Sequence, residues 1–569
     1  MSDKKQRFLR DAWRLAWPFF NSEEKWVARG LILAVTALSL LSVAINVRIN
    51  FWQKDFYNAL QEYDHPEFLK QLLIFSALAF SLIATAVYQI YLGQLLQIRW
   101  RRWMTERYLK AWLSARAYYR IQLTSDGTDN PDQRISDDLE RFTRQFLSLT
   151  VGKAGLLSSV VTFFSFLSIL WTLSGPLTVP LGSFGEIEIP GYLVWIALIY
   201  AVGGTLLTMK IGRPLVPLAF NQQRYEADFR FALVRLRENA ESVAFYRGED
   251  REHATFSERF QRLMANFRAV IWRQKLVNWF GLSYGQLAII FPFIVASPRY
   301  FQKEFQFGEL MQVTDTFVQL QTALSFIVDN YNDIAEFQSV VQRLTTFEDK
   351  AREIATHADE PQPIAVDHEG GGLAVEDLKL DLPSGAPLQS GIALDVAPQS
   401  AMLISGPTGS GKSTLLRAAA SLWPFGRGRI RVGDGNVLFL PQKPYLPLGT
   451  LRNALLYPQA AGGQGDESLD EALKAVGLGD LASELDTEDN WSQRLSLGEQ
   501  QRLAFARLLL TRPSMIFLDE ATSALDEPSE AQLYKMLREA PWHPTIVSVG
   551  HRSTLREFHD KVFELAPAA

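Results

Sequence analysis

The sequence predicts an all-α membrane domain with six spans, followed by an α/β domain built around a phosphate-binding loop. Three observations predict this multidomain class. The chain has 569 residues, which is too long for a single hydrophobic core. Long apolar segments fill the region before residue 330 and are absent after it. Gly406–Ser413 reads G-x-x-x-x-G-K-S and stands between an apolar run and a helix-forming run.

Composition excludes several classes of function. The formal net charge is −5, so the chain gives no reason to expect a nucleic acid partner. There is no cysteine, which excludes disulfides and thiolate metal sites.

Six apolar segments are each close to the ~20 residues that a bilayer requires. All of them contain small or polar residues, as is typical of helices packed in a bundle. The six segments are roughly Trp26–Val47, Leu69–Leu95, Val151–Leu173, Tyr192–Ile211, Leu276–Ala296 and Leu310–Val328.

The distribution of Lys and Arg sets the orientation of these segments. The connections after the second and fourth segments are rich in arginine, whereas Ser174–Gly191 after the third contains neither Lys nor Arg. Positive loops stay in the cytoplasm, so both termini and both long connections are expected there. No targeting segment is visible, which favours a bacterial inner membrane, with several passes, over an organelle.

Four regions follow from these patterns. We expect residues 1–24 to form an amphipathic cytoplasmic helix on the membrane surface. Residues 25–350 form the transmembrane domain with two long cytoplasmic helical extensions, because structureless loops of that length are uncommon. Residues 351–372, which contain Pro361, Pro363 and a run of three glycines, form a linker. Residues 373–569 form the α/β domain, with strands that alternate with helices.

The two extensions are expected to turn at tips near Asp126–Ile135 and Glu238–Glu249. These tips are either plain polar hairpin turns or coupling elements that dock on the α/β domain.

A polar stripe runs along the sixth segment, where Gln312, Asp315, Gln319 and Thr322 share one helical face. A carboxylate that faces lipid is costly, so the stripe predicts a water-filled cargo cavity, to which Arg48 at the end of the first segment also contributes. The alternative is hydrogen bonding between neighbouring helices.

The glycine-rich loop has the chemistry of a nucleotide site. Its glycines let backbone N–H groups approach phosphate oxygens, and the following helix adds partial positive charge. Lys412 is placed for the β- and γ-phosphates and the Ser413 hydroxyl for Mg²⁺. The predicted nucleotide-binding residues of this loop are Gly406, Pro407, Thr408, Gly409, Ser410, Gly411, Lys412, Ser413 and Thr414.

Three later strands end in polar groups. Gln442 ends a short apolar strand and is placed to reach Mg²⁺. His551 ends another strand, and we expect this histidine to contact the γ-phosphate and take part in catalysis. The run Ser514–Leu518 leads into Asp519 and Glu520, as in a buried parallel strand with functional groups at its carboxyl end. Asp519 is expected to hold Mg²⁺, and Glu520 to polarise the attacking water.

Leu495–Arg502 predicts a helix that starts near Gly498. Ser496 and Glu499 fit an S-x-x-E capping box. The structural interpretation is an ordinary helix start. The functional one is a helix N-terminus aimed at a γ-phosphate.

In this order, the motifs resemble those of an ABC transporter along the whole chain. By that resemblance, Gly406–Ser413 is the Walker A loop, Gln442 the Q-loop glutamine and Leu495–Glu499 the signature. The remaining correspondences are Asp519 and Glu520 with Walker B and the catalytic glutamate, Ser523–Asp526 with the D-loop and His551 with the switch histidine. Signature residues Ser496, Gly498 and Glu499 are then expected to contact nucleotide.

Two departures from the family pattern matter. The usual L-S-G-G-Q has Leu497 and Glu499 at its third and fifth positions here, while Ser496 and Gly498 remain. The family normally stacks adenine on an aromatic residue before Walker A. That position falls near Leu382-Pro383, and no Phe, Tyr or Trp occurs between Ala365 and Ser405. Loss of a stacked aromatic removes roughly 0.5–1.5 kcal/mol, so either nucleotide affinity or base selectivity is modest, or Leu382 packs against the base instead.

The membrane half narrows the resemblance. Phe51–Gln61 and Asn130–Arg134 resemble segments of the SbmA/BacA peptide-uptake proteins and their ATPase-fused relatives. Asn239–Tyr246 is similar to a segment of the subfamily D acyl-CoA transporters. The two groups share an exporter-like membrane fold and differ in cargo.

The resemblance implies a half-transporter that acts as a homodimer and hydrolyses ATP with Mg²⁺, because the chain has one Walker A loop and one signature. The expected cargo is hydrophilic or amphiphilic, such as peptides or cobalamin, with uptake favoured. The alternatives are an acyl-CoA or lipid transporter, an exporter, and a membrane-tethered regulatory ATPase that transports nothing.

Overall fold

The structure is a computed structural model that describes residues 2–124, 131–152, 155–180, 186–358, 362–459 and 464–567. It divides into two compact units. The first contains residues 1–114 and 129–352, and the second contains residues 115–128 and 353–569. Each unit is described by itself below.

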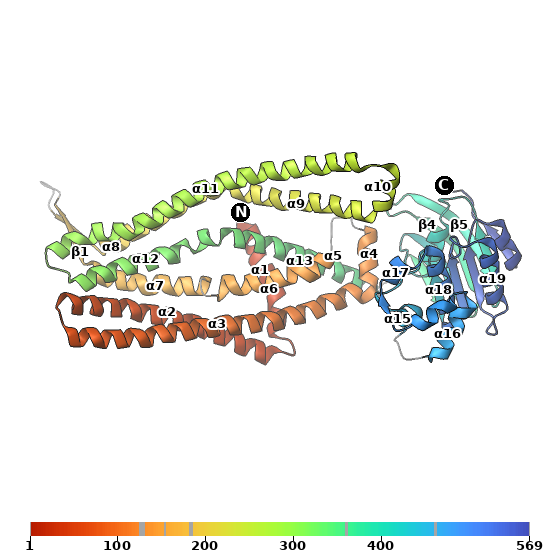
Figure 1. The fold of residues 1–569 in the computed structure, drawn as a ribbon, viewed down its shortest axis with the longest axis horizontal. Coiled ribbons are helices and arrows are strands. Elements are labelled where there is room, and N and C mark those ends of the chain that lie inside the picture. Colours follow the sequence, from red (N-terminus) through yellow and green to blue (C-terminus); the bar gives the residue numbers. More distant parts are fainter. Residues whose placement is uncertain are drawn as a thin grey trace. The chain divides into compact units, whose positions relative to one another are not determined.

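The first unit is almost entirely helical (Figure 1). Its helices are α1 (Ser2–Phe20), α2 (Lys25–Gln61), α3 (His65–Leu113), α5 (Pro131–Gln133), α6 (Leu139–Thr150), α7 (Leu156–Ser174), α8 (Tyr192–Gly212), α9 (Leu215–Glu238), α10 (Ala240–Tyr246), α11 (Glu249–Phe301), α12 (Phe307–Asp329) and α13 (Tyr331–Ala358). A π-helical turn, Arg134–Asp138, joins α5 to α6. Strands β1 (Pro176–Pro180) and β2 (Glu186–Pro190) pair antiparallel between α7 and α8.

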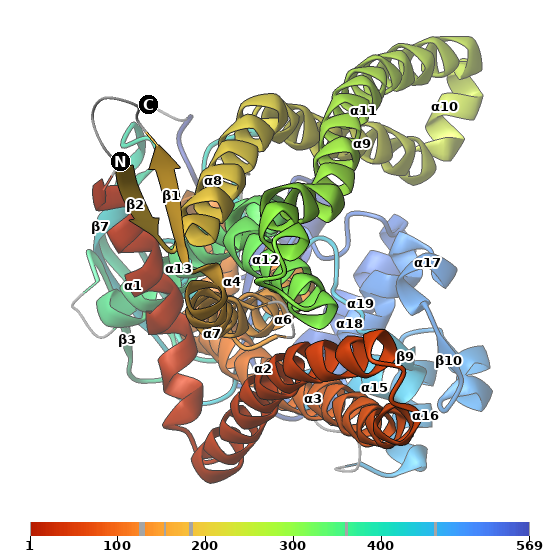
Figure 2. The ribbon, with the colours of Figure 1, turned by 90° about the vertical axis from the view of Figure 1, so that its left-hand side faces the viewer.

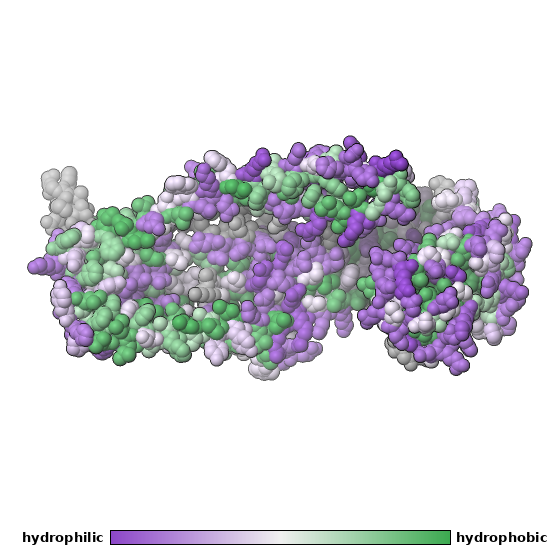
Figure 3. Space-filling model, viewed as in Figure 1, coloured by the Kyte–Doolittle hydropathy of each residue, from purple (hydrophilic) through white to green (hydrophobic). Residues whose placement is uncertain are grey.

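Within the described residues, five helices are long and apolar enough to cross a membrane. They are α2, α3, α7, the helix that begins at Tyr192, and α11. The sixth expected segment forms α12, which has 23 residues but is not among those five. Its glutamines and Asp315 lower its hydropathy, so its place in the membrane depends on the helices that cover it. Figure 3 shows hydrophobic residues gathered over the end of this unit that carries α8 and the α2–α3 turn.

The two arginine-rich connections are helical where the structure describes them. α3 runs without a break for 49 residues, and α11 for 53. Figure 2 shows α9 and α11 lying side by side and joined by α10 as a hairpin, whose α10 end stands away from the other helices of this unit. Elsewhere along its length, α11 contacts α8 and α12. The second tip, Glu238–Glu249, therefore contains α10. Of the first tip, residues 126–130 lie outside the described residues, and Pro131–Gln133 form α5.

α1 is packed against its own unit rather than free along its length. Ala12, Leu15, Ala16 and Phe19 are buried, and the Phe19 ring stacks on Trp100 of α3 at 5.5 Å. A second apolar ridge, formed by Leu9, Trp13 and Trp17, stays exposed. The expected membrane-surface position of residues 1–24 remains a prediction, and this ridge is the surface that would meet lipid.

The described residues of the second unit form two larger sheets and one two-stranded sheet. A parallel sheet has the order β13-β6-β12-β11-β8, and a second sheet has the order β3-β7-β4-β5. The strands are β3 (Ile364–His368), β4 (Leu373–Asp381), β5 (Pro387–Val396), β6 (Ala401–Ser405), β7 (Gly426–Val432), β8 (Val437–Leu440), β9 (Gly449–Thr450), β10 (Glu488–Asp489), β11 (Met515–Asp519), β12 (Thr545–Val549) and β13 (Lys561–Glu564). The short β9 and β10 pair with each other.

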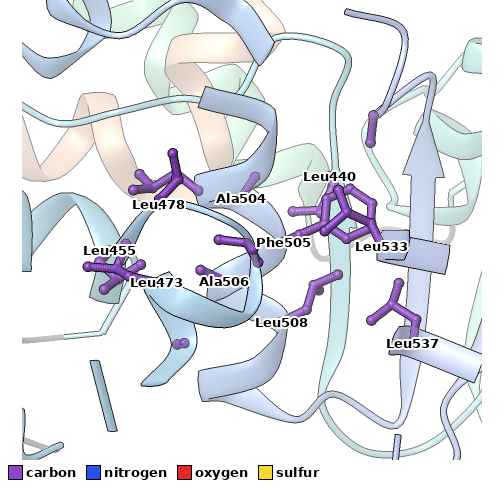
Figure 4. Close-up of a cluster of buried hydrophobic side chains, with 14 of the residues drawn as sticks. Leu440, Leu455, Leu473, Leu478, Ala504, Phe505, Ala506, Leu508, Leu533 and Leu537 are labelled. Atoms are coloured by element: carbon purple, nitrogen blue, oxygen red, sulfur yellow. The ribbon is translucent and has the colours of Figure 1, made fainter. Parts of the chain in front are cut away.

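The helices of the second unit are α4 (Ala117–Thr124), α14 (Lys412–Ala419), α15 (Leu451–Leu456), α16 (Asp466–Ala475), α17 (Trp491–Arg494), α18 (Leu497–Thr511) and α19 (Glu527–Arg538). Strands β6, β11 and β12 are buried over nearly their whole length, as expected for parallel strands covered on both faces. Figure 4 shows one core, in which Phe505 and Leu508 of α18 lie among Leu440, Leu533 and Leu537. This packing fixes α18 against the sheet.

A buried histidine, His559, forms a hydrogen bond with strand β12 of the parallel sheet. The His559 ring is held at Nδ1 by the Leu555 carbonyl (2.6 Å) and at Nε2 by the Ser548 hydroxyl (2.8 Å). Since the carbonyl only accepts, Nδ1 carries a proton and donates it to Leu555. Burial lowers the pKa of His559 below its ordinary value.

We expect the folded protein to lose stability as the pH falls below about 6.5, because unfolded chains then bind a proton that folded His559 resists. The stability that neutral His559 contributes is complete above that pH. Calorimetry of the full chain in detergent at pH 7.5 and pH 5.5 measures it. His559→Gln should reduce the pH-dependent loss in melting temperature by about 2–4 °C. Exposed His368, changed to Gln, is the matched control, and an equal effect there would contradict the assignment.

Candidate functional site

The phosphate-binding loop joins the end of β6 to the start of α14. Gly406, Gly409 and Gly411 have φ values of +147°, +82° and +90°, which other residues adopt only with strain. A Cβ on Gly406 would lie 2.7 Å from the Leu565 carbonyl oxygen. The glycines are therefore required by the turn itself, and the turn directs successive backbone N–H groups toward one point at the N-terminus of α14.

Lys412, the first residue of α14, lies inside this turn. Its ammonium donates to the carbonyl oxygens of Gly406 (2.8 Å) and Pro407 (2.9 Å). The side chain is 6% exposed, and burial lowers its pKa. A buried cation held at the centre of a loop of N–H donors is suited to bind a multiply charged anion.

Ser413, in the first turn of α14, meets Asp519 at the carboxyl end of β11. The Ser413 hydroxyl donates to Asp519 Oδ1 at 2.8 Å. Asp519 ends β11, and burial raises its pKa despite this hydrogen bond. A hydroxyl and a carboxylate side by side are the oxygen ligands that Mg²⁺ accepts in a site completed by phosphates and water, so the residues present fit this ion.

Glu520 follows directly and has a strained backbone, with φ at +49°. One carboxylate oxygen accepts from Gln442 Nε2 at 3.1 Å, and the other lies 3.1 Å from His551 Nε2. Such strain in a residue other than glycine costs of order 1–3 kcal/mol and is concentrated at functional sites. The three side chains that sequence reasoning chose from three separate strand ends thus form one cluster.

Gln442 was expected to reach Mg²⁺. In the structure its amide instead donates to Glu520, beside the Ser413–Asp519 pair. Its observed contact is with the carboxylate expected to act on water, and the metal contact stays a prediction.

The signature residues form a second group at the N-terminus of α18. The Ser496 hydroxyl donates to Glu499 Oε2 (2.7 Å), the Ser496 N–H donates to the same oxygen (2.9 Å), and the Glu499 N–H donates back to the hydroxyl. This complete capping box stabilises the helix start by roughly 0.5–2 kcal/mol. The hydrogen bonds from Ser496 lower the pKa of Glu499, so its carboxylate stays ionised at neutral pH.

Two supporting residues were missed by the motif analysis. Gln389 of β5 is buried and donates to the carbonyl oxygens of Ser410 (3.1 Å) and Ala566 (2.7 Å), which ties the phosphate loop to the end of the described chain. Gln501 of α18 is fully buried and contacts two other motifs. A polar residue on the apolar face of a predicted helix was the available signal for Gln501.

The helical unit corrects part of the predicted cargo stripe. Gln312 is 1% exposed, and its side chain donates to Asn50 Oδ1 at 3.0 Å, so it lies between α12 and α2 rather than along a cavity. Asn50 in turn donates to Asp315 Oδ2 (2.7 Å) and Thr316 Oγ1 (3.0 Å). The helix-contact alternative therefore holds for Gln312. Asp315 and Gln319 are partly exposed and Arg48 is exposed.

The contact between α2 and α12 continues along the Phe51–Gln61 segment. Lys54 pairs with Glu309 at 3.1 Å, and Asn58 accepts from the Gly308 N–H at 2.8 Å. A Cβ on Gly308 would lie 2.1 Å from the Lys54 carbonyl oxygen, so the two helices approach closely there. This segment, singled out by its resemblance to peptide-uptake proteins, joins α2 to the first turns of α12.

A short segment between the α3 and α5 helices belongs to the second unit. The Arg116 guanidinium donates to the carbonyl oxygen of Ala420, just after α14, at 2.7 Å. Leu123 of α4 packs against the buried cluster of the second unit that includes Leu415, Leu416 and Trp423. The docking residues of the first connection thus precede the expected tip, and α4 contacts the end of the helix that starts at the phosphate loop.

Comparison with known proteins agrees with these assignments. The family model for the ABC transporter transmembrane region 2 matches residues 15–301, and that for the ABC transporter matches residues 389–523. An uncharacterized ABC transporter ATP-binding protein of Haemophilus influenzae is 37% identical over 96% of this chain and 91% of its own length. The human protein named lysosomal cobalamin transporter ABCD4 is 30% identical over 98% and 94%.

Among solved structures, a bacterial Atm1-family ABC exporter with ATP bound has a TM-score of 0.76. It is 20% identical and aligns over 95% of this chain and 96% of its own, which shows the shared fold. The helical membrane domain, the α/β nucleotide-binding domain and the glycine-loop site occur together in one chain, as in these relatives. The chain therefore belongs to the ABC transporter family, as a half-transporter related to the D-family members that couples ATP hydrolysis to transport.

Proposed function

We propose that two copies of this chain form an ATP-driven importer for a hydrophilic or amphiphilic cargo, such as a peptide or cobalamin, in a bacterial inner membrane. The observation that carries the ATP-dependent part is the cluster of Glu520, Gln442 and His551 next to the phosphate loop. The arginine-rich connections support cytoplasmic termini. The relative named as a cobalamin transporter supports the cargo class.

Each residue of the site has a defined task in this proposal. The loop N–H groups and Lys412 bind the β- and γ-phosphates and neutralise their charge. Mg²⁺, held through Ser413 and Asp519, supplies charge stabilisation on the same phosphates. Glu520 accepts a hydrogen bond from the attacking water and draws its proton, while Gln442 and His551 keep the carboxylate oriented.

The proposed homodimer accounts for the two groups of site residues, one around the phosphate loop and Glu520 and the other at the N-terminus of α18. Ser496 and Gly498 present an exposed helix N-terminus whose hydrogen bonds stay within its own first turn. A second copy related by a two-fold axis places each such terminus against the other copy's γ-phosphate and makes two identical sites. Closure and reopening of these sites would drive the membrane helices.

α10 is the proposed second coupling element. Phe245 and Tyr246 are 79% and 85% exposed at the tip of the α9–α11 hairpin. Two large aromatic side chains so exposed are suited to enter a pocket on a partner surface. With α4 packed on its own nucleotide-binding domain, the α10 tip is proposed to dock on that of the second copy.

The cargo part of the proposal is tested in proteoliposomes, with ATP outside on the side of the nucleotide-binding domains. Cobalamin, a panel of peptides and acyl-CoA are offered in turn, and cargo movement and ATP hydrolysis are both measured. Stimulation by cobalamin or peptide supports the proposal. Stimulation by acyl-CoA alone supports a lipid-type transporter, and hydrolysis without movement of any cargo supports a regulatory ATPase.

We expect Asp315→Asn and Arg48→Gln each to reduce cargo movement about tenfold while basal ATP hydrolysis persists, because each removes one charged partner from the path. Glu23→Gln and Lys25→Gln change the same charges at exposed positions before the first span and are the matched controls. Equal transport by the path variants and their controls would contradict a polar path through α2 and α12.

A further inference from the structure

One side chain connects three motifs of the nucleotide-binding domain. Gln501 lies in the second turn of α18 and is fully buried. Its Nε2 donates to the backbone carbonyl of Gln442 at 2.9 Å and to the Ser523 hydroxyl at 3.2 Å, and its Oε1 accepts from the Ala524 N–H at 3.0 Å. The signature helix, the Q-loop and the D-loop are therefore joined through a single amide.

The hydrogen bond from Gln501 to the Gln442 carbonyl links α18 to the residues that serve the ATP bound by the same chain. Gln442 is the residue whose side-chain amide donates to Glu520, and Gln501 holds the backbone of that same residue. A shift of α18 would move the Gln442 backbone and, with it, the donor that orients the catalytic carboxylate. The amide of Gln501 thus acts on the hydrolytic cluster without touching the reacting atoms.

The N-terminus of the same helix, one turn before Gln501, is exposed. Ser496 caps the N-terminus of α18 and is exposed, and half-buried Gly498 lies in the first turn of the helix. The D-loop packs close beside this turn, since a Cβ on Gly498 would lie 3.3 Å from the Ala524 carbonyl oxygen. Arg552, next to His551, donates to the Ser523 and Leu525 carbonyls and holds the D-loop from its other side.

We propose that Gln501 is a positioning residue that couples the two ATP sites. It fixes the helix terminus offered to the second copy's nucleotide to the Q-loop and D-loop that serve the chain's own nucleotide. This inference rests on the proposed homodimer. Occupation of one site by ATP would then reach Glu520 of the same chain through a rigid connection one helical turn long.

The neighbouring glutamine provides an internal comparison. Gln500 is also buried, but its amide donates to the carbonyls of Ser492 and Leu495, in the turn that leads into α18. It has no such contact with the Q-loop or D-loop among the described hydrogen bonds. Two adjacent buried glutamines with the same chemistry therefore differ in what they connect.

The test measures ATP hydrolysis by the full chain in proteoliposomes as a function of ATP concentration. Coupled sites give the wild-type protein a Hill coefficient above 1, with an upper limit of 2 for two sites. Gln501→Leu should bring the coefficient to about 1 and lower kcat about 10–100-fold, since three polar groups lose their shared partner. Gln500→Leu should lower the melting temperature by about as much as Gln501→Leu does, but it should keep the wild-type Hill coefficient.

Gln501→Glu separates the two connections. Its carboxylate still accepts from the Ala524 N–H and the Ser523 hydroxyl, but it presents an acceptor to the Gln442 carbonyl. If Gln501 acts through Gln442, the losses in kcat caused by Gln501→Glu and Gln442→Ala should be strongly non-additive in the double variant. Additive losses would overturn that route.

The coupling proposal is overturned if Gln501→Leu keeps the wild-type Hill coefficient, if Gln500→Leu loses it equally, or if a dimeric wild-type protein has a coefficient of 1. Failure of the homodimer proposal looks different. It would appear as a monomer in light scattering of the Glu520→Gln protein with ATP, whatever the kinetics of the Gln501 variants.

Discussion

Replacing Glu520 with glutamine is expected to lower the rate of ATP hydrolysis by about 10²–10⁴-fold and to leave ATP binding in place. The substitution preserves the size of the side chain and removes the charge that draws a proton from water. The surrounding donors explain why the effect should be large. Gln442 and His551 each contact one carboxylate oxygen at 3.1 Å, so the charge is oriented before substrate arrives.

The measurement is phosphate release under saturating ATP, together with equilibrium binding of a fluorescent ATP analogue. Glu539→Gln, an exposed position at the end of α19, is the matched control for charge. Hydrolysis at the parent rate would remove Glu520 from the mechanism. Loss of both binding and hydrolysis would indicate that the strained backbone at this position has rearranged instead.

The nucleotide site was largely predictable because its residues are local signals at strand ends. The pattern of an apolar run that ends in a polar residue identified Gln442, Asp519 and His551 from the sequence alone. The S-x-x-E capping pattern identified Ser496 and Glu499. The sequence could not predict the contacts that these strand ends make with one another. Gln442 was assigned to metal, but its amide is directed at Glu520, a relation that depends on how β8 and β11 pair.

In the membrane domain, the sequence predicted the helices but not which of their faces are buried. Helical periodicity put Gln312 and Asp315 on one stripe, but it carries no information on which neighbour covers that stripe. Only the packing of α12 against α2 distinguishes buried Gln312, bonded to Asn50, from the partly exposed Asp315. Likewise, the amphipathic pattern of residues 1–24 could not reveal that α1 has two apolar faces, one of which packs on Trp100.

Replacing Lys412 with methionine is expected to weaken ATP binding at least about 100-fold, and hydrolysis at subsaturating ATP with it. Methionine keeps most of the buried stem and removes only the cation. Hydrogen bonds to charged groups contribute roughly 1.5–3 kcal/mol each, and the ammonium is placed where the anion must sit. Arg417→Met, at an exposed position in the last turn of α14, removes one positive charge from the same helix and is the control.

The two variants together separate binding from chemistry. If Lys412 serves the phosphates and Glu520 the water, then Glu520→Gln should hold ATP and form the dimer, whereas Lys412→Met should do neither. A protein that carries both changes should behave like Lys412→Met in binding, because a site that does not retain ATP gives the carboxylate nothing to act on. Dimer formation by the double variant in ATP would contradict the proposal that nucleotide holds the two copies together.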